Sequence, residues 1–259
     1  MTSLRCAVLP PLLEADAVRK AEATLALDAG LPVDADAAIE APSGIPGRPP
    51  RPELIPHNQL AQKSVALLEG RAALIHSIAH IELNAIDLAL DIVWRFPGMP
   101  DEFYRDWVSI AREEARHFTL LRDHLVMLGF DYGSFQAHNG LWEMAEKTNG
   151  DLLARIALVP RTLEARGLDA SPMVRKKLIS VGDHKAGAII DVILRDEIGH
   201  VAVGNRWYRY LCVQRGLDPV ATYAELSERY KAPHLRGPFN LEARRAAGFD
   251  EEELAALGR

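Results

Sequence analysis

Apolar residues recur at helical spacing along four long segments, and each segment carries a glutamate in the middle of its apolar face. The segments are roughly 66–96, 101–128, a stretch that begins at Asp151, and 183–215. The glutamates are Glu82, Glu114, Glu164 and Glu197. An unpaired charge on a face that will be buried is costly, so it must be neutralised, hydrogen-bonded or bound to a metal. These four acids therefore constrain the fold and the chemistry together.

The other periodic segments of the chain are helical as well. Residues 12–29 alternate apolar and charged residues at helical spacing up to Gly30, and a short helix is predicted near 141–148. The third long helix is predicted to weaken at 166–172, "RGLDASP", with "MVRKKLIS" as a separate helical piece after it. Because no segment has the alternation of a strand, the sequence predicts an all-α fold.

Three parts are predicted along the chain. Residues 1–58 form an N-terminal helix and a connector that packs on the main domain. Its stretch "APSGIPGRPPRPELIPHN" holds six prolines and two glycines in eighteen residues, which excludes a helix or a central strand. Residues 59–217 form an antiparallel four-helix bundle, and residues 218–259 form short C-terminal helices broken at "KAPHLRGPFN".

Length, charge and cysteine content exclude several classes of protein. The chain has 259 residues, enough for a sizeable core, and its net charge of −6 gives no electrostatic footprint for nucleic acid. Its two cysteines cannot build a disulfide framework, and the N-terminus lacks the features of a signal peptide. No apolar run approaches the ~20 residues of a membrane helix. A soluble cytoplasmic protein without a membrane partner is therefore expected.

Two of the four acids belong to a Glu-x-x-His motif, which the chain contains twice. Glu114 is followed by His117, and Glu197 is followed by His200. Residues i and i+3 share a helix face, so both side chains of a motif can reach one point. Each motif alone is weak evidence, because a histidine on an apolar face is more often a packed core residue than a metal ligand.

The register of the four acids favours a common site. Glu82 and Glu114 are equidistant from Gly98 in the turn "PGMP", so an antiparallel hairpin folded there brings both carboxylates to one level. The other two acids have their midpoint at residues 180 and 181, just before a glycine. Two helical hairpins with matched acids are therefore predicted, the second one distorted by the break in the third helix.

One glutamate on each of two helices, with Glu-x-x-His on each of the other two, is the ligand pattern of di-iron and di-manganese carboxylate bundles. Four carboxylates neutralise two divalent ions, and two neutral imidazoles complete the coordination. The positions three after the lone glutamates, Ala85 and Gly167, are small where a histidine would complete the motif. The predicted metal ligands are Glu82, Glu114, His117, Glu164, Glu197 and His200.

The sequence around these positions resembles a bacterial family, the domain of unknown function 455, within the ferritin-like superfamily. The matching stretches are "AHIELNAIDLALD" (79–91), "REEARHF" (112–118), "PRTLEARGLD" (160–169) and "LRDEIGHVAVGNRW" (194–207). This resemblance covers most of the chain after the first helix and implies a ferritin-like four-helix bundle with a di-metal centre at the six ligands. More distantly, the site resembles that of the tRNA-modifying di-iron hydroxylase.

Five further residues are candidates for supporting roles. Glu113 and Asp196 each precede a ligand glutamate and would either orient a ligand histidine or be exposed helix charges. Arg161, one turn before a lone glutamate, would balance the charge of the site, bind an anionic substrate or pair with a surface acid. Gly204 and Tyr208 follow the second motif by one and two turns. They would line a pocket near the metals, although helix packing also explains both.

The expected function is that of a di-iron oxygenase or oxidase. Two metal ions, Fe/Fe or Mn/Fe, would activate dioxygen to hydroxylate or dehydrogenate an organic substrate, with an electron donor as partner. Iron oxidation without an organic substrate, and a metal-stabilised protein without turnover, are the alternatives. The sequence does not name the substrate, and it leaves open a small molecule, a nucleotide-type compound including tRNA, and a homodimer.

Overall fold

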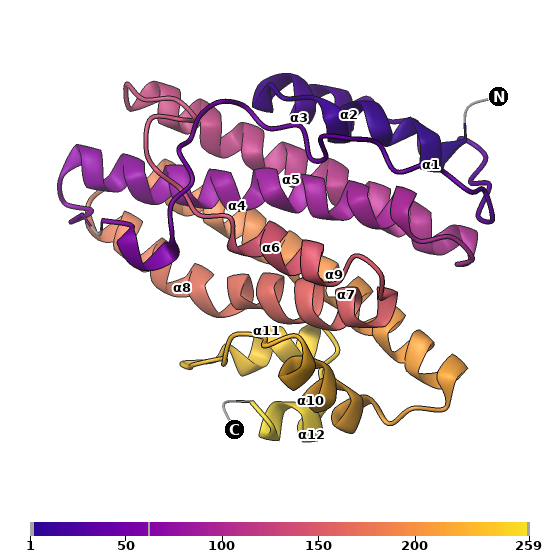
Figure 1. Cartoon of the computed structure of the whole chain (residues 1–259). Helices are drawn as coiled ribbons and strands as arrows, with labels where there is room; N and C mark the ends of the chain where they lie inside the picture. The colour runs from indigo at the N-terminus through magenta and orange to yellow at the C-terminus, as the bar shows by residue number, and fades with distance from the viewer. Residues whose placement is uncertain (1–2, 62, 258–259) are drawn as a thin grey trace. The chain divides into compact units, whose positions relative to one another are not determined.

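The computed structural model describes residues 3–61 and 63–257, whose regular elements are helices (Figure 1). The first five are α1 (Leu4–Ala7), α2 (Leu9–Leu13), α3 (Ala17–Leu25), α4 (Leu68–Arg95) and α5 (Asp101–Met127). Seven follow: α6 (Gly140–Lys147), α7 (Leu152–Leu158), α8 (Ala165–Ser180), α9 (His184–Arg215), α10 (Pro219–Arg229), α11 (Leu241–Ala246) and α12 (Glu251–Ala255). Two further segments are a 3-10 turn, η1 (His57–Gln59), and a π-helix, η2 (Val159–Glu164). Since these residues contain no strand, the all-α prediction is confirmed.

The chain divides into two compact units. The first comprises Met1–Trp142 and Val181–Ile189, and the second comprises Glu143–Ser180 and Ile190–Arg259. Two of the three boundaries fall inside α6 and α9, so each of these helices contributes residues to both units, and the third follows the end of α8. The division of the chain into three parts, which the sequence predicts, stays a prediction.

A hairpin of two long helices, α4 and α5, supplies many of the buried side chains of the first unit. The turn between them contains Gly98 at φ +80°, a left-handed conformation that suits glycine. The Tyr104 hydroxyl closes the turn, because it accepts from the Met99 amide at 3.1 Å and donates to the Phe96 carbonyl at 2.9 Å. The turn lies where the sequence predicts it, and so do both helices to within two residues at each end.

The segment 12–29, predicted as one helix, is divided in two. Helix α2 ends at Leu13, and Glu14 takes an extended conformation with φ −65° and ψ 124°. Asp16 then begins α3, because its Oδ1 accepts from the Arg19 amide at 2.9 Å. The prediction of a single helix is wrong because the capping signal of Asp16 outweighs the continuous apolar spacing.

Two buried cations hold the N-terminal helices within the first unit. Arg5 donates from Nε to the Val93 carbonyl at 3.1 Å and from Nη2 to the Trp94 carbonyl at 2.7 Å. Lys20 forms an ion pair with Asp87, and both side chains are buried. Because a buried ion needs a partner, these contacts fix α1 and α3 against α4.

The proline-rich connector is irregular apart from η1, as predicted. Its backbone is held at a few points: the Gly47 amide donates to the Leu12 carbonyl at 2.8 Å, and the Ile55 amide donates to the Ala137 carbonyl at 2.9 Å. Leu54 and Ala137 form an isolated parallel bridge. These bonds fix the connector along other parts of the first unit.

The break in the third long helix lies earlier than the sequence predicts. Helix α7 ends at Leu158, the π-helix η2 follows with Pro160 near its start, and α8 then continues without interruption to Ser180. The prediction of a break at 166–172 is therefore wrong. Pro160 has no amide hydrogen to donate one turn back, so the regular α-helical bonding is interrupted at this residue.

Pro172 is accommodated inside α8. A proline removes the hydrogen bond to the carbonyl four residues earlier, which here belongs to Leu168. That carbonyl accepts instead from Nδ2 of Asn240 at 3.2 Å. A residue far along the chain thus satisfies the group that the proline leaves unbonded, and "MVRKKLIS" belongs to α8 rather than to a separate helix.

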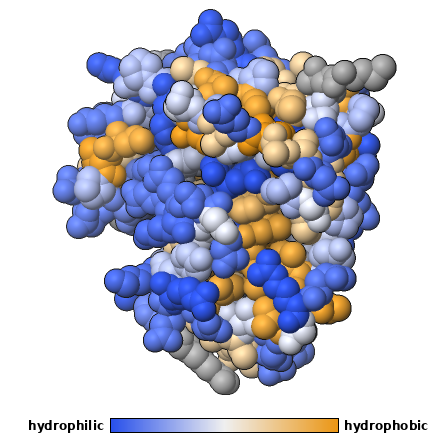
Figure 2. Space-filling model, turned by 45° about the vertical axis from the view of Figure 1, so that its right-hand side comes forward, coloured by the Kyte–Doolittle hydropathy of each residue, from blue (hydrophilic) through white to orange (hydrophobic). Residues whose placement is uncertain are grey.

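Helix α4 is the one helix of the described residues that is long and apolar enough to span a membrane. Within its most apolar window, 72% is buried inside the protein, as expected for the core helix of a soluble protein. The polar residues Glu82, Asp87 and Asp91 interrupt any continuous apolar run in it. Figure 2 shows one face of the molecule, on which hydrophilic residues predominate and apolar residues gather in patches.

Candidate metal centre

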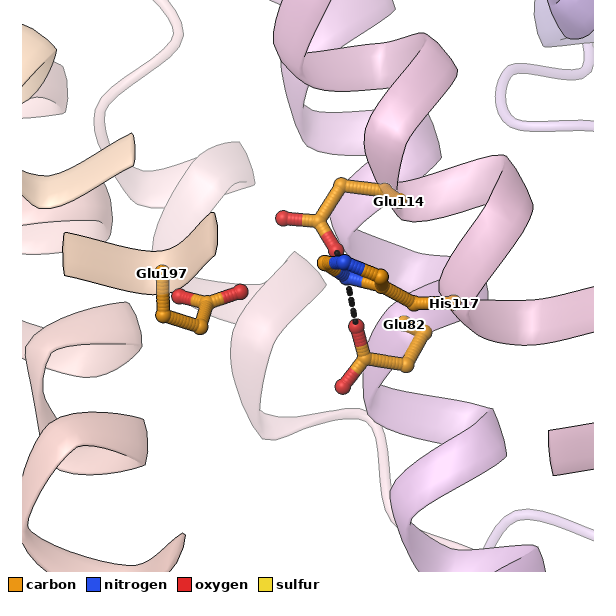
Figure 3. A group of neighbouring side chains, drawn as sticks. All are labelled: Glu82, Glu114, His117 and Glu197. Atoms are coloured by element: carbon orange, nitrogen blue, oxygen red, sulfur yellow. Dashed lines mark hydrogen bonds and ion pairs between the residues drawn. The ribbon is translucent and has the colours of Figure 1, made fainter. Parts of the chain in front are cut away.

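Three predicted ligands meet in the first unit and form what we call the first half-site: Glu82 on α4, with Glu114 and His117 on α5. All three are buried, with exposed fractions of 4%, 1% and 0%. Nδ1 of His117 lies 3.1 Å from Oε2 of Glu82 and 3.3 Å from Oε2 of Glu114 (Figure 3). One potential ligand atom from each residue lies within 4.8 Å of the others. The hairpin turn at Gly98 therefore gives α4 and α5 the register that the sequence predicts.

The first half-site retains protons when no cation is bound. Burial and the nearby Glu114 carboxylate raise the pKa of Glu82 well above its usual range, against the opposing effect of His117. Burial alone would lower the pKa of His117, but hydrogen bonds to Glu114 and Glu82 raise it to about 11. A divalent cation would replace these protons, because it can neutralise both carboxylates and bind the imidazole nitrogen.

The second unit holds the other three predicted ligands, Glu164, Glu197 and His200, which we call the second half-site. Glu197 and His200 lie on α9 with exposed fractions of 7% and 1%, and Nδ1 of His200 is 3.3 Å from Oε1 of Glu197. Glu164 is half-buried at the end of η2. A Cβ at Gly167, three residues later, would lie 3.9 Å from Oε2 of Glu197. Gly167 therefore lies close to Glu197, at a distance where a Cβ would make an ordinary van der Waals contact.

The π-helix η2 determines where Glu164 points. The Thr162 hydroxyl donates to the Ala157 carbonyl, five residues earlier, at 2.7 Å. A π-helical turn holds an additional residue, so it rotates every later side chain relative to a continuous α-helix. Such segments are frequent at functional sites, and this one ends on a predicted ligand.

Each half-site therefore has the donors of a metal site: two carboxylates and one imidazole. The described part of the first unit contains a buried Glu/His cluster that can hold a metal ion. Oxygen donors with imidazole suit iron and manganese, whereas a set without thiolates is unlike the usual structural zinc site. The residues present thus fit divalent ions of this class.

Arg161 is held by partners other than the predicted ligands. Its Nε donates to Oδ1 of Asn205 at 2.8 Å, and its Nη2 pairs with Glu253 of α12. Among the three roles that the sequence left open, this is pairing with an acid, but the acid is buried rather than exposed. Glu253 was not found from the sequence, because the short distance between it and Arg161 arises only when α12 packs in the second unit.

The two acids that precede ligand glutamates differ in their surroundings. Glu113 is half-buried on α5. Asp196 is half-buried on α9 and accepts from Nε of its neighbour Arg195 at 2.8 Å. That contact binds Asp196 to a surface cation, whereas an orienting role for either acid stays a prediction.

Gly204 and Tyr208 take part in helix packing. A Cβ at Gly204 would lie 3.1 Å from Cβ of Pro160, so the glycine lets α9 approach η2 closely. The Tyr208 ring is buried beneath the Arg161 guanidinium at 4.6 Å, and its hydroxyl donates to the Pro219 carbonyl at 2.7 Å. Both positions thus take part in packing, and a role in lining a pocket near the metals stays a prediction.

Comparisons with known proteins identify the family that the chain resembles. Residues 13–255 match the model of a family described as "Protein of unknown function (DUF455)". A relative from Haemophilus influenzae, described as "Uncharacterized protein", is 48% identical over 213 residues, which cover 80% of this chain and 74% of the relative. No solved structure matches the chain.

Proposed function

The chain belongs to the DUF455 family, and since that description carries no activity, we propose a function from its own residues. We propose a di-iron carboxylate oxidoreductase that uses dioxygen to hydroxylate or dehydrogenate an organic substrate. The observation that supports this most directly is the burial of two carboxylates against one imidazole in the first half-site. A buried set of this kind is stabilised by a divalent ion and costly without one.

We further propose that the two half-sites face each other in a ferritin-like antiparallel four-helix bundle formed by α4, α5, α7 with α8, and α9. The support is chemical: each half-site offers one lone glutamate and one Glu-x-x-His pair. Together they supply the four negative charges that two divalent ions require. When bound, a pair of iron ions supplies the redox chemistry that activates dioxygen.

The residues of the chain would hold this centre and keep it dry. The carboxylates neutralise the ions, and His117 must lose its proton to bind, since a ligand imidazole is neutral. Neighbouring core residues such as Ala85, Ala111 and Phe118 are almost fully buried, so water has little access to the first half-site. A dry site with fixed ligands limits side reactions of an activated oxidant. A cytoplasmic location and an electron-donor partner complete the proposal.

Metal content after anaerobic loading with Fe(II) tests the ligand assignment. Wild type is expected to retain two Fe per chain after desalting, and Glu114→Ala and His200→Ala are each expected to retain fewer than one. Glu102→Ala, which removes an exposed acid from the first turn of α5, is the matched control and should bind as wild type does. Equal iron retention in all four proteins would show that the residue assignment is wrong.

Spectroscopy and oxygen uptake separate the functions. An exchange-coupled iron pair in the Mössbauer spectrum would support one shared centre, whereas two uncoupled ions would contradict the facing arrangement of the half-sites. Oxygen consumption that yields a hydroxylated or dehydrogenated product supports the oxidoreductase. Oxygen uptake in fixed proportion to added Fe(II), without any organic product, would assign iron oxidation instead. Competitive loading with Mn(II) distinguishes Fe/Fe from Mn/Fe.

A further inference from the structure

A pocket with a volume of about 710 Å³ lies entirely within the second unit. Its walls come from α10, the segment 231–235, α11 and α12, with Arg161 of η2. On α10 the lining positions are 220, 223, 224, 227 and 228, which follow the helical repeat and so define one face of that helix. A volume of this size is typical of sites for small organic molecules.

The body of the pocket is apolar. Val220 and Tyr223 line it from α10, and Phe249 and Leu257 line it from just before and just after α12. Small residues such as Ala224 leave the space between these larger side chains open. An occupant would therefore have a mainly apolar body, because moving apolar surface out of water lowers the free energy.

Two buried donors in the wall have no acceptor among the described residues. Arg244 is fully buried, and its Nε and Nη2 donate to Asp169 at 3.0 and 2.6 Å. Its Nη1 has no hydrogen-bond partner, and neither does the hydroxyl of Ser227 on α10. Both residues line the pocket. An unsatisfied buried donor costs free energy, so these two groups favour an occupant that brings an acceptor.

The other charged groups of the lining carry both signs, and each is either already paired or exposed to solvent. Arg161 is held by Glu253 and Asn205, so it is already satisfied. Lys231 is exposed at the pocket and adds a positive charge beside it. Glu228 is exposed as well and lies on the same helix face as Ser227. The buried donors are thus the groups that remain for a ligand.

We propose that this pocket binds a small, mostly apolar organic acid. Its carboxylate accepts hydrogen bonds from Nη1 of Arg244 and from the hydroxyl of Ser227, and its apolar body packs along the α10 face. Arginine suits this role because its planar fork can bind Asp169 and a second carboxylate at once. The site does not depend on metal binding, since none of its lining residues is a predicted ligand.

Calorimetric titration of the full chain with decanoate tests this proposal, with decanol and decylamine as probes of equal chain length. Decanoate is expected to bind with one site per chain and at least tenfold more tightly than either of the others. Ser227→Ala should weaken decanoate binding roughly tenfold, because one hydrogen bond to a charged group is lost. Ala224→Trp should abolish binding by filling the pocket.

The control is Ser180→Ala, an exposed serine at the end of α8, which should leave decanoate binding unchanged. Arg244→Lys keeps the charge and removes the fork, and it should also weaken binding at least tenfold in protein whose thermal unfolding is still cooperative. Equal affinity for decanoate and decylamine would overturn the head-group assignment. Unchanged decanoate binding in Ala224→Trp would overturn the location. The same titrations on iron-free and iron-loaded protein separate this site from the proposed metal centre.

Discussion

We predict that His76 makes the first unit sensitive to acid, and the prediction can be tested quantitatively. The side chain is fully buried on α4, and its Nε2 accepts from the Gly133 amide at 2.9 Å. The ring also stacks on Tyr132 with 5.3 Å between centroids. Gly133 has φ +92°, so the loop that supplies this amide adopts a conformation that favours glycine. Protonation of His76 would remove the acceptor and place a charge in the interior.

The magnitude follows from the pKa. Burial lowers the pKa of His76 from 6.5 to about 4. As the pH falls, the unfolded chain takes up this proton first, so the free energy of unfolding decreases between pH 6.5 and about 4. A shift of one pKa unit corresponds to about 1.36 kcal/mol. His76 therefore lowers the free energy of unfolding at pH 4.5 by roughly 2.5 kcal/mol relative to neutral pH. Burial lowers the pKa of His80 in the same way, so a comparison of variants is needed to isolate His76.

Urea denaturation of wild type and His76→Gln between pH 8 and pH 4.5 measures the difference. Glutamine offers an acceptor near the Nε2 position but cannot be protonated, so the variant should lose roughly 2.5 kcal/mol less than wild type over this range. His184→Gln, which replaces an exposed histidine at the start of α9, should follow wild type. If the curves of wild type and His76→Gln stay parallel from pH 8 to pH 4.5, the assignment of acid sensitivity to His76 is wrong.

Three further changes test the packing of the fold. Lys20→Met leaves Asp87 buried without its partner and is expected to lower the free energy of unfolding by about 3–5 kcal/mol, with most of the loss recovered in Lys20→Met/Asp87→Leu. Gly204→Ala places a Cβ 3.1 Å from Pro160 and should cost about 1–3 kcal/mol, whereas Gly199→Ala on the same helix meets nothing within 4 Å and should not destabilise. Asp250→Ala removes the capping box with Glu253 and should cost about 1 kcal/mol. Chemical denaturation measures each free energy of unfolding. A Lys20→Met variant as stable as wild type would contradict the role of the buried ion pair. Equal effects of the two glycine variants would contradict the close packing at Gly204, and an unchanged Asp250→Ala would contradict the capping box.

The first half-site could be predicted from the sequence because its geometry is local. Glu114 and His117 are three residues apart on one helix, and a single turn at Gly98 relates them to Glu82. Equal spacing from a tight turn is sufficient to place two side chains at one level, since both helices rise 1.5 Å per residue. In the structure Glu82 lies 3.1 Å from His117, one turn after Glu114, as expected when the two acids share a level.

The second unit could not be predicted to the same degree, because its register depends on bonds between distant residues. The sequence predicts a regular helix from Asp151 to Glu164, but η2 adds a residue to the turn before Glu164. The sequence signal for this turn is Pro160 rather than the glycine and proline of 166–172. Pro172 reads as a helix breaker until Asn240, far along the chain, is seen to satisfy the Leu168 carbonyl. The buried ion pair between Arg161 and Glu253 likewise joins segments that no local pattern connects.

The pocket of the second unit could not be predicted from the sequence for the same reason, because it too depends on how distant segments pack. Residues 220, 223, 224 and 227 repeat at helical spacing, and such a face is normally covered by a neighbouring helix. Only the arrangement of α10, α11 and α12 leaves that face lining a pocket, and only burial shows that Nη1 of Arg244 has no acceptor there. A set of ligands whose positions depend on one helix and one turn, such as the first half-site, can therefore be predicted from this sequence. A pocket that forms because no neighbouring helix covers an apolar helix face can be found only from the structure.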